Sequence, residues 1–209
     1  MILKKLFTKT APLYLLTDTQ LAGLTNIQIT RQALRAGIRV IQLREKNLSK
    51  REIFNEALSL KTLTTEHKAA LIINDHIDIA LAVNADGVHL GQEDMPLPEA
   101  RKIIGSKKII GISTHSLRQA QKAEQEGADY IGFGPIFHTG TKDAGKPKGL
   151  KALQKISEHI NVPIVAIGGI TSGNIKEVLM SGADAAAIAS GILHGSIRKN
   201  TLDYMSSLK

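Results

Sequence analysis

The chain has 209 residues, of which 43% are hydrophobic and 22% are charged, enough for the core of one domain. It has no cysteine, which excludes disulfides and thiolate metal sites and is compatible with a cytoplasmic location. The net charge of +8 could serve nucleic acid, a membrane surface or an anionic metabolite, and the scattered basic residues and only 3% aromatics argue against nucleic acid. No segment has the length of a membrane span or a signal sequence, so we expect a soluble, cytoplasmic protein.

Eight short, apolar, β-branched runs alternate with longer stretches of helical period, which is typical of parallel strands joined by crossover helices. We expect strands over Leu13–Thr17, Val40–Arg44, Ala70–Asn74, Gly87–Leu90, Ile109–Ser113, Asp129–Gly132, Pro163–Ile167 and Ala185–Ala189.

Four of these strands follow similar segments, in which a glycine or asparagine is expected to end the preceding helix: Gly37, Asn84, Gly127 and Gly182. Eight βα units in about 200 residues are more than an open doubly wound sheet usually needs. The sequence therefore predicts a single (β/α)8 TIM barrel over about residues 13–195, within one domain of residues 1–209.

Polar residues follow the predicted strands. In a parallel barrel the carboxyl ends of all strands meet on one face, so residues distant in sequence should converge there. Asp75 and Asp94 follow neighbouring strands, and their hard oxygen ligands suit Mg²⁺, which also takes substrate phosphates. The alternative is that each caps the helix after it, because Asp75 precedes IDIALAV and Asp94 precedes MPLPEA.

Cations and glycine-rich loops accompany these carboxylates. Arg44, Lys46 and Lys142 could neutralise a diphosphate, although an isolated cation is more often a solvated surface residue. Residues 132–142 combine glycines with hydroxyl and ammonium donors, as anion-binding loops do, and a plain flexible loop is the alternative. Gly168-Gly169 and Ser190 follow the last two strands, where barrels often bind phosphate.

Two histidines, His89 and His115, lie near the predicted strand ends. His115 could act as a general acid or base, whereas His89, inside GVHL, is expected to be packed or structural. The sequence identifies no partner for either, so neither is assigned to catalysis.

Taken together, these motifs resemble the thiamine phosphate synthase family. The resemblance is carried by QLREK at 42–46, Asn74-Asp75, HLGQED at 89–94, GISTH at 111–115, GPIFHTGTK at 134–142 and AIGGI at 166–170. It continues through Gly182-Ala183-Asp184 to Ala189-Ser190 and covers nearly all of the chain from Leu13 onward. His138 and Ala189 depart from the family's usual proline and bulkier aliphatic residue, which could alter the thiazole pocket.

The resemblance implies a transferase of thiamine biosynthesis that forms a C–N bond. It would join 4-amino-2-methyl-5-hydroxymethylpyrimidine diphosphate to 4-methyl-5-(2-phosphoethyl)thiazole, giving thiamine phosphate and diphosphate in a Mg-assisted dissociative substitution. Mg²⁺ is the implied cofactor and the two phosphorylated heterocycles are the implied partners. The oligomeric state is left open, with a homodimer among the options.

The same resemblance assigns roles to individual residues. Asp75 and Asp94 would hold the metal, and Arg44, Lys46, Ser113 and Lys142 would act in catalysis. The pyrimidine diphosphate would be bound by Gln42, Leu43, Arg44, Glu45, Lys46, Asn74, Ser113 and Lys142. The thiazole phosphate would be bound by Thr139, Gly140, Thr141, Gly169, Ala189 and Ser190.

Two rivals remain at this stage. The related thiazole tautomerase shares the barrel, but as the resemblance has it, lacks the full diphosphate and metal set. A non-catalytic sensor of a thiamine precursor could also use an inherited barrel, because a fold does not by itself give a function.

Overall fold

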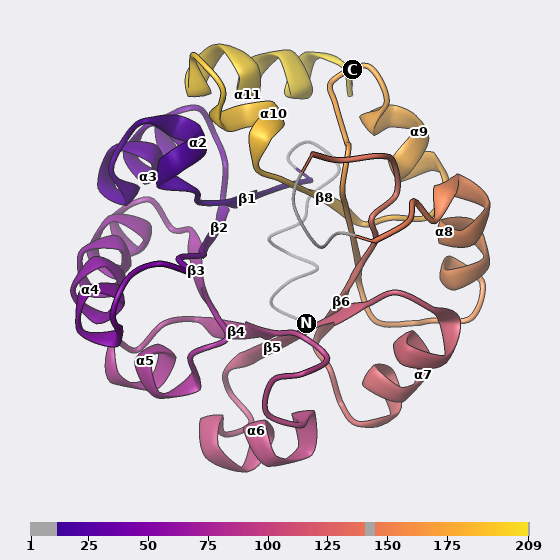
Figure 1. The fold of residues 1–209 in the computed structure, drawn as a ribbon, viewed down its shortest axis with the longest axis horizontal. Helices are drawn as coiled ribbons and strands as arrows, with labels where there is room; N and C mark the ends of the chain where they lie inside the picture. Colours follow the sequence, from indigo (N-terminus) through magenta and orange to yellow (C-terminus); the bar gives the residue numbers. More distant parts are fainter. Residues whose placement is uncertain (1–11, 141–144, 209) are drawn as a thin grey trace.

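The computed structural model describes residues 12–140 and 145–208. Eight parallel strands close into a barrel in chain order, each pairing with the next and β8 pairing with β1 (Figure 1). The strands are β1 Leu13–Leu16, β2 Val40–Leu43, β3 Ala70–Asn74, β4 Gly87–Leu90, β5 Ile109–Thr114, β6 Tyr130–Phe133, β7 Ile164–Ile167 and β8 Ala185–Ile188. The predicted (β/α)8 barrel is therefore confirmed, and each strand boundary lies within one residue of its expected place.

Helices form the outer ring around this barrel (Figure 1). They are α2 Thr19–Ala22, α3 Asn26–Arg35, α4 Lys50–Glu66, α5 Ile77–Ala82, α6 Leu97–Ile104, α7 Leu117–Gln125, α8 Gly149–Ser157, α9 Ile175–Met180, α10 Ser190–Leu193 and α11 Ile197–Ser206. Within the described residues no helix combines the length and apolarity needed to cross a bilayer.

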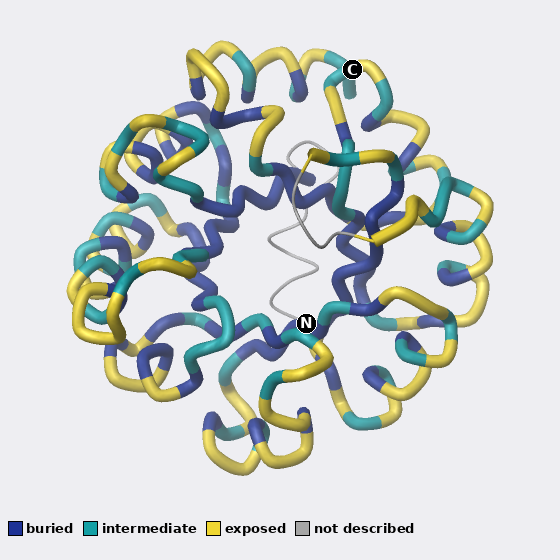
Figure 2. Tube along the Cα trace, viewed as in Figure 1, coloured by how far each residue is buried: buried dark blue, intermediate teal, exposed yellow. Residues whose placement is uncertain are grey.

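The alternation of side chains along each strand creates two separate cores. Leu13 and Leu15 of β1 pack outward with the helices, whereas Tyr14 and Leu16 belong to a smaller cluster inside the barrel. Figure 2 shows the result, with the strands buried and exposure confined mainly to the outer faces of the helices and the loops. Because both faces of every strand are covered, continuous apolar runs were the appropriate strand signal.

The expected helix stops are also confirmed. Gly37, Asn84, Gly127 and Gly182 follow α3, α5, α7 and α9 and adopt φ values of 106°, 53°, 90° and 100°. This left-handed region is the one that glycine and, less readily, asparagine tolerate.

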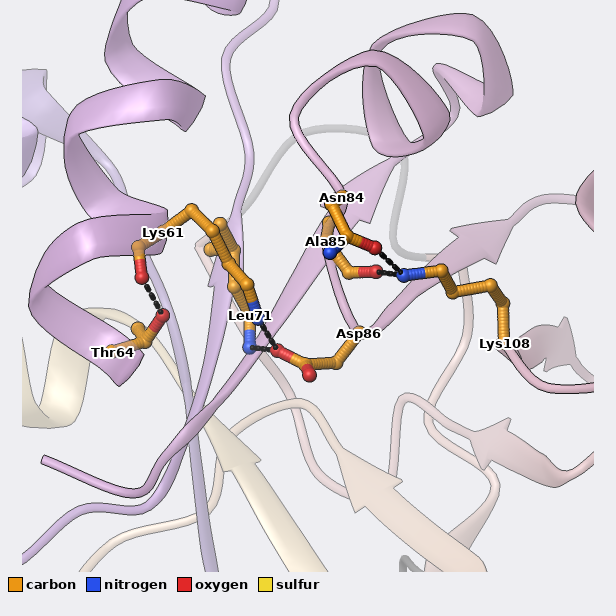
Figure 3. Close-up of polar contacts among 7 residues, drawn as sticks. All are labelled: Lys61, Thr64, Leu71, Asn84, Ala85, Asp86 and Lys108. Carbon is orange, nitrogen blue, oxygen red and sulfur yellow. Dashed lines mark hydrogen bonds and ion pairs between the residues drawn. The ribbon is translucent and has the colours of Figure 1, made fainter. Parts of the chain in front are cut away.

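Three aspartates that follow these stops bind the preceding strand. Asp86, Asp129 and Asp184 each accept a hydrogen bond, at 2.8 Å, from a backbone N–H near the start of β3, β5 or β7. Asp86 also pairs with Lys61 at 2.9 Å (Figure 3). These carboxylates lie at the amino-terminal ends of the strands, the face of a barrel that serves stability.

Candidate active site

Two adjoining cavities lie among strand residues and the loops that follow the strands. The inner cavity, about 120 Å³, is lined by Tyr14, Leu16, Gln42, Arg44, Asn74, His89, Ser113, Tyr130, Gly132, Val165, Ile167 and Ala187. The rim cavity, about 130 Å³, is lined by Leu16, Thr17, Asp18, Leu21, Arg44, Thr139, Ile167, Gly168, Gly169, Ile170, Ala187, Ile188, Ala189, Ser190 and Gly191. The two cavities share a wall formed by Leu16, Arg44, Ile167 and Ala187. Arg44 is the cationic residue of this wall.

Some of the predicted site residues line these cavities, and Leu43, Glu45, Lys46, Asp75, Asp94 and Gly140 line neither. Gln42, Asn74 and Ser113 line the inner one, and Thr139, Gly169, Ala189 and Ser190 line the rim cavity. Arg44 lines both, and its backbone N–H donates to the Thr17 hydroxyl at 3.2 Å, which fixes the turn after β2. Residues predicted from distant positions in the sequence are thus brought together in two groups.

Asp75 and Asp94 form a pair of carboxyl groups within hydrogen-bonding reach of each other. Burial and the neighbouring Asp94 raise the pKa of Asp75 to about 6, against opposing effects of Lys46 and Arg44. Asp94 is oriented by the Gly91 N–H, which donates to its Oδ2 at 2.7 Å. Like charges held this close disfavour ionisation, so the pair is suited to a cation placed between them.

The capping alternative for both aspartates is wrong. Helix α5 begins after His76 and α6 begins after Pro96, and neither start has a side-chain cap. Asp75 instead has φ of 63°, a left-handed conformation that an aspartate tolerates better than most residues. Its backbone N–H donates to the His89 carbonyl at 2.9 Å, which ties the end of β3 to β4.

The remaining residues of the QLREK motif point in different directions. Leu43 is buried in the outer core with the helices and lines neither cavity. Glu45 accepts a hydrogen bond from the Asn26 amide at 2.7 Å, which attaches the loop after β2 to the start of α3. Lys46 is exposed and acts electrostatically on Asp75.

The loop after β6 is described only in part. Thr139 lines the rim cavity, whereas Gly140 is exposed and lines neither cavity. Thr141 and Lys142 lie outside the described residues. Their predicted roles in binding the thiazole phosphate and the diphosphate stay predictions.

Position 169 requires a glycine for two reasons: its backbone has a positive φ, and the loop after β6 passes close to its Cα. Its φ is 65°, and a Cβ there would lie 2.4 Å from the His138 carbonyl oxygen and 2.7 Å from Cβ of Phe137. Only glycine allows the loops after β6 and β7 to meet at the rim cavity in this way.

Sequence reasoning missed a chain of polar groups inside the barrel. Tyr14, Gln42, His89, Ser113 and Tyr130 are joined by hydrogen bonds and all line the inner cavity. Burial lowers the pKa of His89 to about 4, against the opposing charge of Asp94. His115, by contrast, is exposed and its Nδ1 contacts the Gly134 carbonyl at 2.8 Å.

The sequence feature that could have indicated this chain of polar groups is the alternation along each strand, in which every second side chain faces the barrel interior. Tyr14 alternates with Leu13 and Leu15, so the phenol had to face the barrel interior once the strand was placed. A buried tyrosine hydroxyl normally has a hydrogen-bond partner, which makes an inward tyrosine a marker of internal polarity. No comparable pattern would have identified Thr17, Asp18 and Leu21 in the rim cavity.

Comparisons with known proteins agree over most of the chain. The family model described as thiamine monophosphate synthase matches residues 13–192. The chain is 50% identical over 185 residues to the thiamine-phosphate synthase of Lawsonia intracellularis, covering 88% of this chain and 85% of that protein. It is 49% identical over 183 residues to the Clostridium novyi thiamine-phosphate synthase, covering 87% and 90%. The solved thiamine phosphate pyrophosphorylase of Pyrococcus furiosus superimposes with a TM-score of 0.89 at 41% identity, covering 97% of each chain.

Proposed function

Because this chain belongs to the thiamine monophosphate synthase family, we propose that it is a transferase that makes thiamine phosphate. The substrates would be 4-amino-2-methyl-5-hydroxymethylpyrimidine diphosphate and 4-methyl-5-(2-phosphoethyl)thiazole. The observation that carries this proposal is the pair of adjoining cavities that share Arg44. A reaction between two phosphorylated heterocycles needs two neighbouring sites, and a cation between them can serve both anions.

The inner cavity is assigned to the pyrimidine diphosphate. It is lined by amide and hydroxyl groups of Gln42, Asn74 and Ser113, which can hydrogen-bond a polar ring. The rim cavity is assigned to the thiazole phosphate, because Gly168, Gly169 and Ser190 offer backbone N–H groups and a hydroxyl to a phosphate.

Mg²⁺ fits the carboxylate pair as the cofactor. Within residues 12–140 and 145–208, no cluster of three or more histidine, aspartate and glutamate side chains could form a cage for a metal ion. Two carboxylates in contact satisfy the usual preference of Mg²⁺, which takes one or two carboxylates and completes its shell with water and substrate phosphates. Asp75 and Asp94 would hold the ion, and it would neutralise charge on the diphosphate.

The reaction breaks the bond between the pyrimidine methylene carbon and a diphosphate oxygen. The bonding electrons leave with the diphosphate, and the lone pair of the thiazole nitrogen forms the new C–N bond. That nitrogen carries no proton, so orientation matters more than a general base. Arg44, Lys46 and Lys142 would stabilise the departing negative charge, and Ser113 would hold the substrate from β5.

The proposal is tested by incubating the purified protein with both substrates and Mg²⁺ and measuring thiamine phosphate by mass spectrometry. We expect product with both substrates and none when either is omitted or when EDTA exceeds Mg²⁺. An Asp94→Asn variant should lose turnover. Saturable binding of the substrates without product would instead support a sensor, and isomerisation of the thiazole phosphate alone would support a tautomerase.

A further inference from the structure

Helix α11 contacts the wall of the rim cavity through one side chain. Tyr204 is buried, with 3% of its surface exposed, and its hydroxyl donates to the Ile170 carbonyl at 2.8 Å. Ile170 lies in the loop after β7 and lines the rim cavity. A residue near the end of the chain, on a helix of the outer ring, is therefore bound directly to the backbone of this cavity (Figure 1).

The same hydroxyl lies against the backbone that follows β8. Gly191 belongs to α10 and also lines the rim cavity. A Cβ at Gly191 would lie 2.1 Å from the Tyr204 hydroxyl oxygen and 3.2 Å from Cζ of its ring. The absence of a side chain at Gly191 thus makes room for the hydroxyl, and Tyr204 meets the loop after β7 and α10 at once.

Hydrogen bonds to two carbonyls determine how the loop after β7 faces the cavity. The Gly168 carbonyl accepts from the Phe137 N–H at 3.0 Å, and the Gly169 carbonyl accepts from the Asn174 amide at 3.1 Å. Across a trans peptide the next N–H points away from the carbonyl, so the Gly169 and Ile170 N–H groups point away from these partners. Within the part of the chain that the structure describes, neither N–H donates to another group. Both residues line the rim cavity, so their N–H groups are available to an anion there.

We infer that Tyr204 is a positioning residue for a phosphate group bound in the rim cavity. It holds the Ile170 carbonyl and packs beside Gly191, and it thereby sets the distance between the two segments that carry the proposed phosphate donors. Tyr204 itself lines neither cavity, so it acts only through the backbone that it contacts. The identity of the ligand, the thiazole phosphate, rests on the proposed function, whereas the coupling of the two segments does not.

The effect on affinity is tested with two variants of α11 that each delete one buried hydroxyl. Tyr204→Phe removes the bond to Ile170 and keeps the ring, whereas Thr201→Val removes a hydroxyl that has no hydrogen-bond partner among the described residues. We expect Tyr204→Phe to raise the KM for the thiazole phosphate about 5-fold, as for the loss of one hydrogen bond. Both kcat and the KM for the pyrimidine diphosphate should change less than about 2-fold, and Thr201→Val should change none of the three. An unchanged KM for the thiazole phosphate in Tyr204→Phe, or equal rises in both KM values, would overturn the inference.

The coupling of the two segments is tested by thermal denaturation, which needs no turnover. Gly191→Ala places a methyl group against the Tyr204 hydroxyl, so it should lower the Tm of the otherwise unaltered protein by about 5 °C. In the Tyr204→Phe background the hydroxyl is gone, and the same substitution should lower the Tm by no more than about half as much. Equal losses in the two backgrounds would overturn the inference.

A failure of the proposed function gives a different result. The unaltered protein would then make no thiamine phosphate, and inorganic phosphate replaces the substrate as the probe, with its binding followed through the amide NMR signal of Gly169. Weaker phosphate binding by Tyr204→Phe than by Thr201→Val would support the positioning role of Tyr204, and equal binding by the two variants would overturn it.

Discussion

Asp75→Asn should stabilise the metal-free protein, because it removes a carboxylate that the fold holds against another. The pKa of Asp75 rises from 3.8 to about 6 in the folded state. A raised carboxyl pKa means that the folded protein binds this proton more tightly than the unfolded chain does. Stability therefore falls as pH rises from about 4 through 6, and the loss is complete above that range. Asparagine also tolerates the left-handed backbone at this position.

The magnitude follows from the two pKa values. A difference of roughly two units corresponds to about 3 kcal/mol, and solvent screening of this half-exposed side chain reduces the figure to about 1 kcal/mol. At pH 8 without metal, Asp75→Asn should then raise the Tm by about 3 °C for a chain of this size. At pH 4 the two proteins should melt at similar temperatures.

Thermal denaturation with EDTA and with Mg²⁺ measures both effects. Mg²⁺ should raise the Tm of the unaltered protein at pH 8 and have little effect on Asp75→Asn. Asp78→Asn is the control, because Asp78 is an exposed carboxylate paired with Lys50 at 2.9 Å and its pKa is lowered. Its removal should not stabilise the protein at pH 8. A lower Tm for metal-free Asp75→Asn at pH 8, or an equal response of both proteins to Mg²⁺, would refute the reasoning.

Three further outcomes are expected. Gly111→Ala should destabilise the protein by about 1–3 kcal/mol in urea denaturation, because its Cβ would overlap the Tyr130 ring. Asp86→Ala should lower the free energy of unfolding by about 1–3 kcal/mol while KM stays unchanged, because it removes the acceptor for the Leu71 N–H away from the cavities. Lys142→Ala should lower kcat by about 10²–10³-fold in steady-state assays with little change in the KM for the thiazole phosphate, because the role proposed for Lys142 is to stabilise the departing diphosphate.

The strands were predictable because each is a short apolar run followed or preceded by a strong local signal. The glycines and Asn84 at the helix ends have the positive φ values that their chemistry favours, so sequence and backbone agree at these points. The role of Asp86 was not predictable, because this residue precedes β4 and its carboxylate accepts a hydrogen bond from the Leu71 N–H on β3. Such a contact depends on register, which a single sequence does not specify.

The site residues that follow the carboxyl ends of strands could be predicted from the sequence. The contacts among side chains inside the barrel could not. Arg44, Asn74 and Ser113 were expected on one face because parallel strands end there together, and they do line one cavity. His89 was expected to be packed or structural, and its ring is hydrogen-bonded to Tyr130 and Ser113 inside the barrel. Its link to Ser113 depends on Gly111 standing between two larger residues at the same level, which only the paired strands reveal.

The position of Arg44 has a consequence for inhibitor design. Arg44 lines both cavities, so anionic groups bound on either side could share its guanidinium group. A compound with two linked head groups, one for each cavity, could engage Arg44 once and bring its second group to the neighbouring cavity at a high effective concentration. Linker length would then govern potency, and a short linker that passes the Arg44 side chain is the natural starting point.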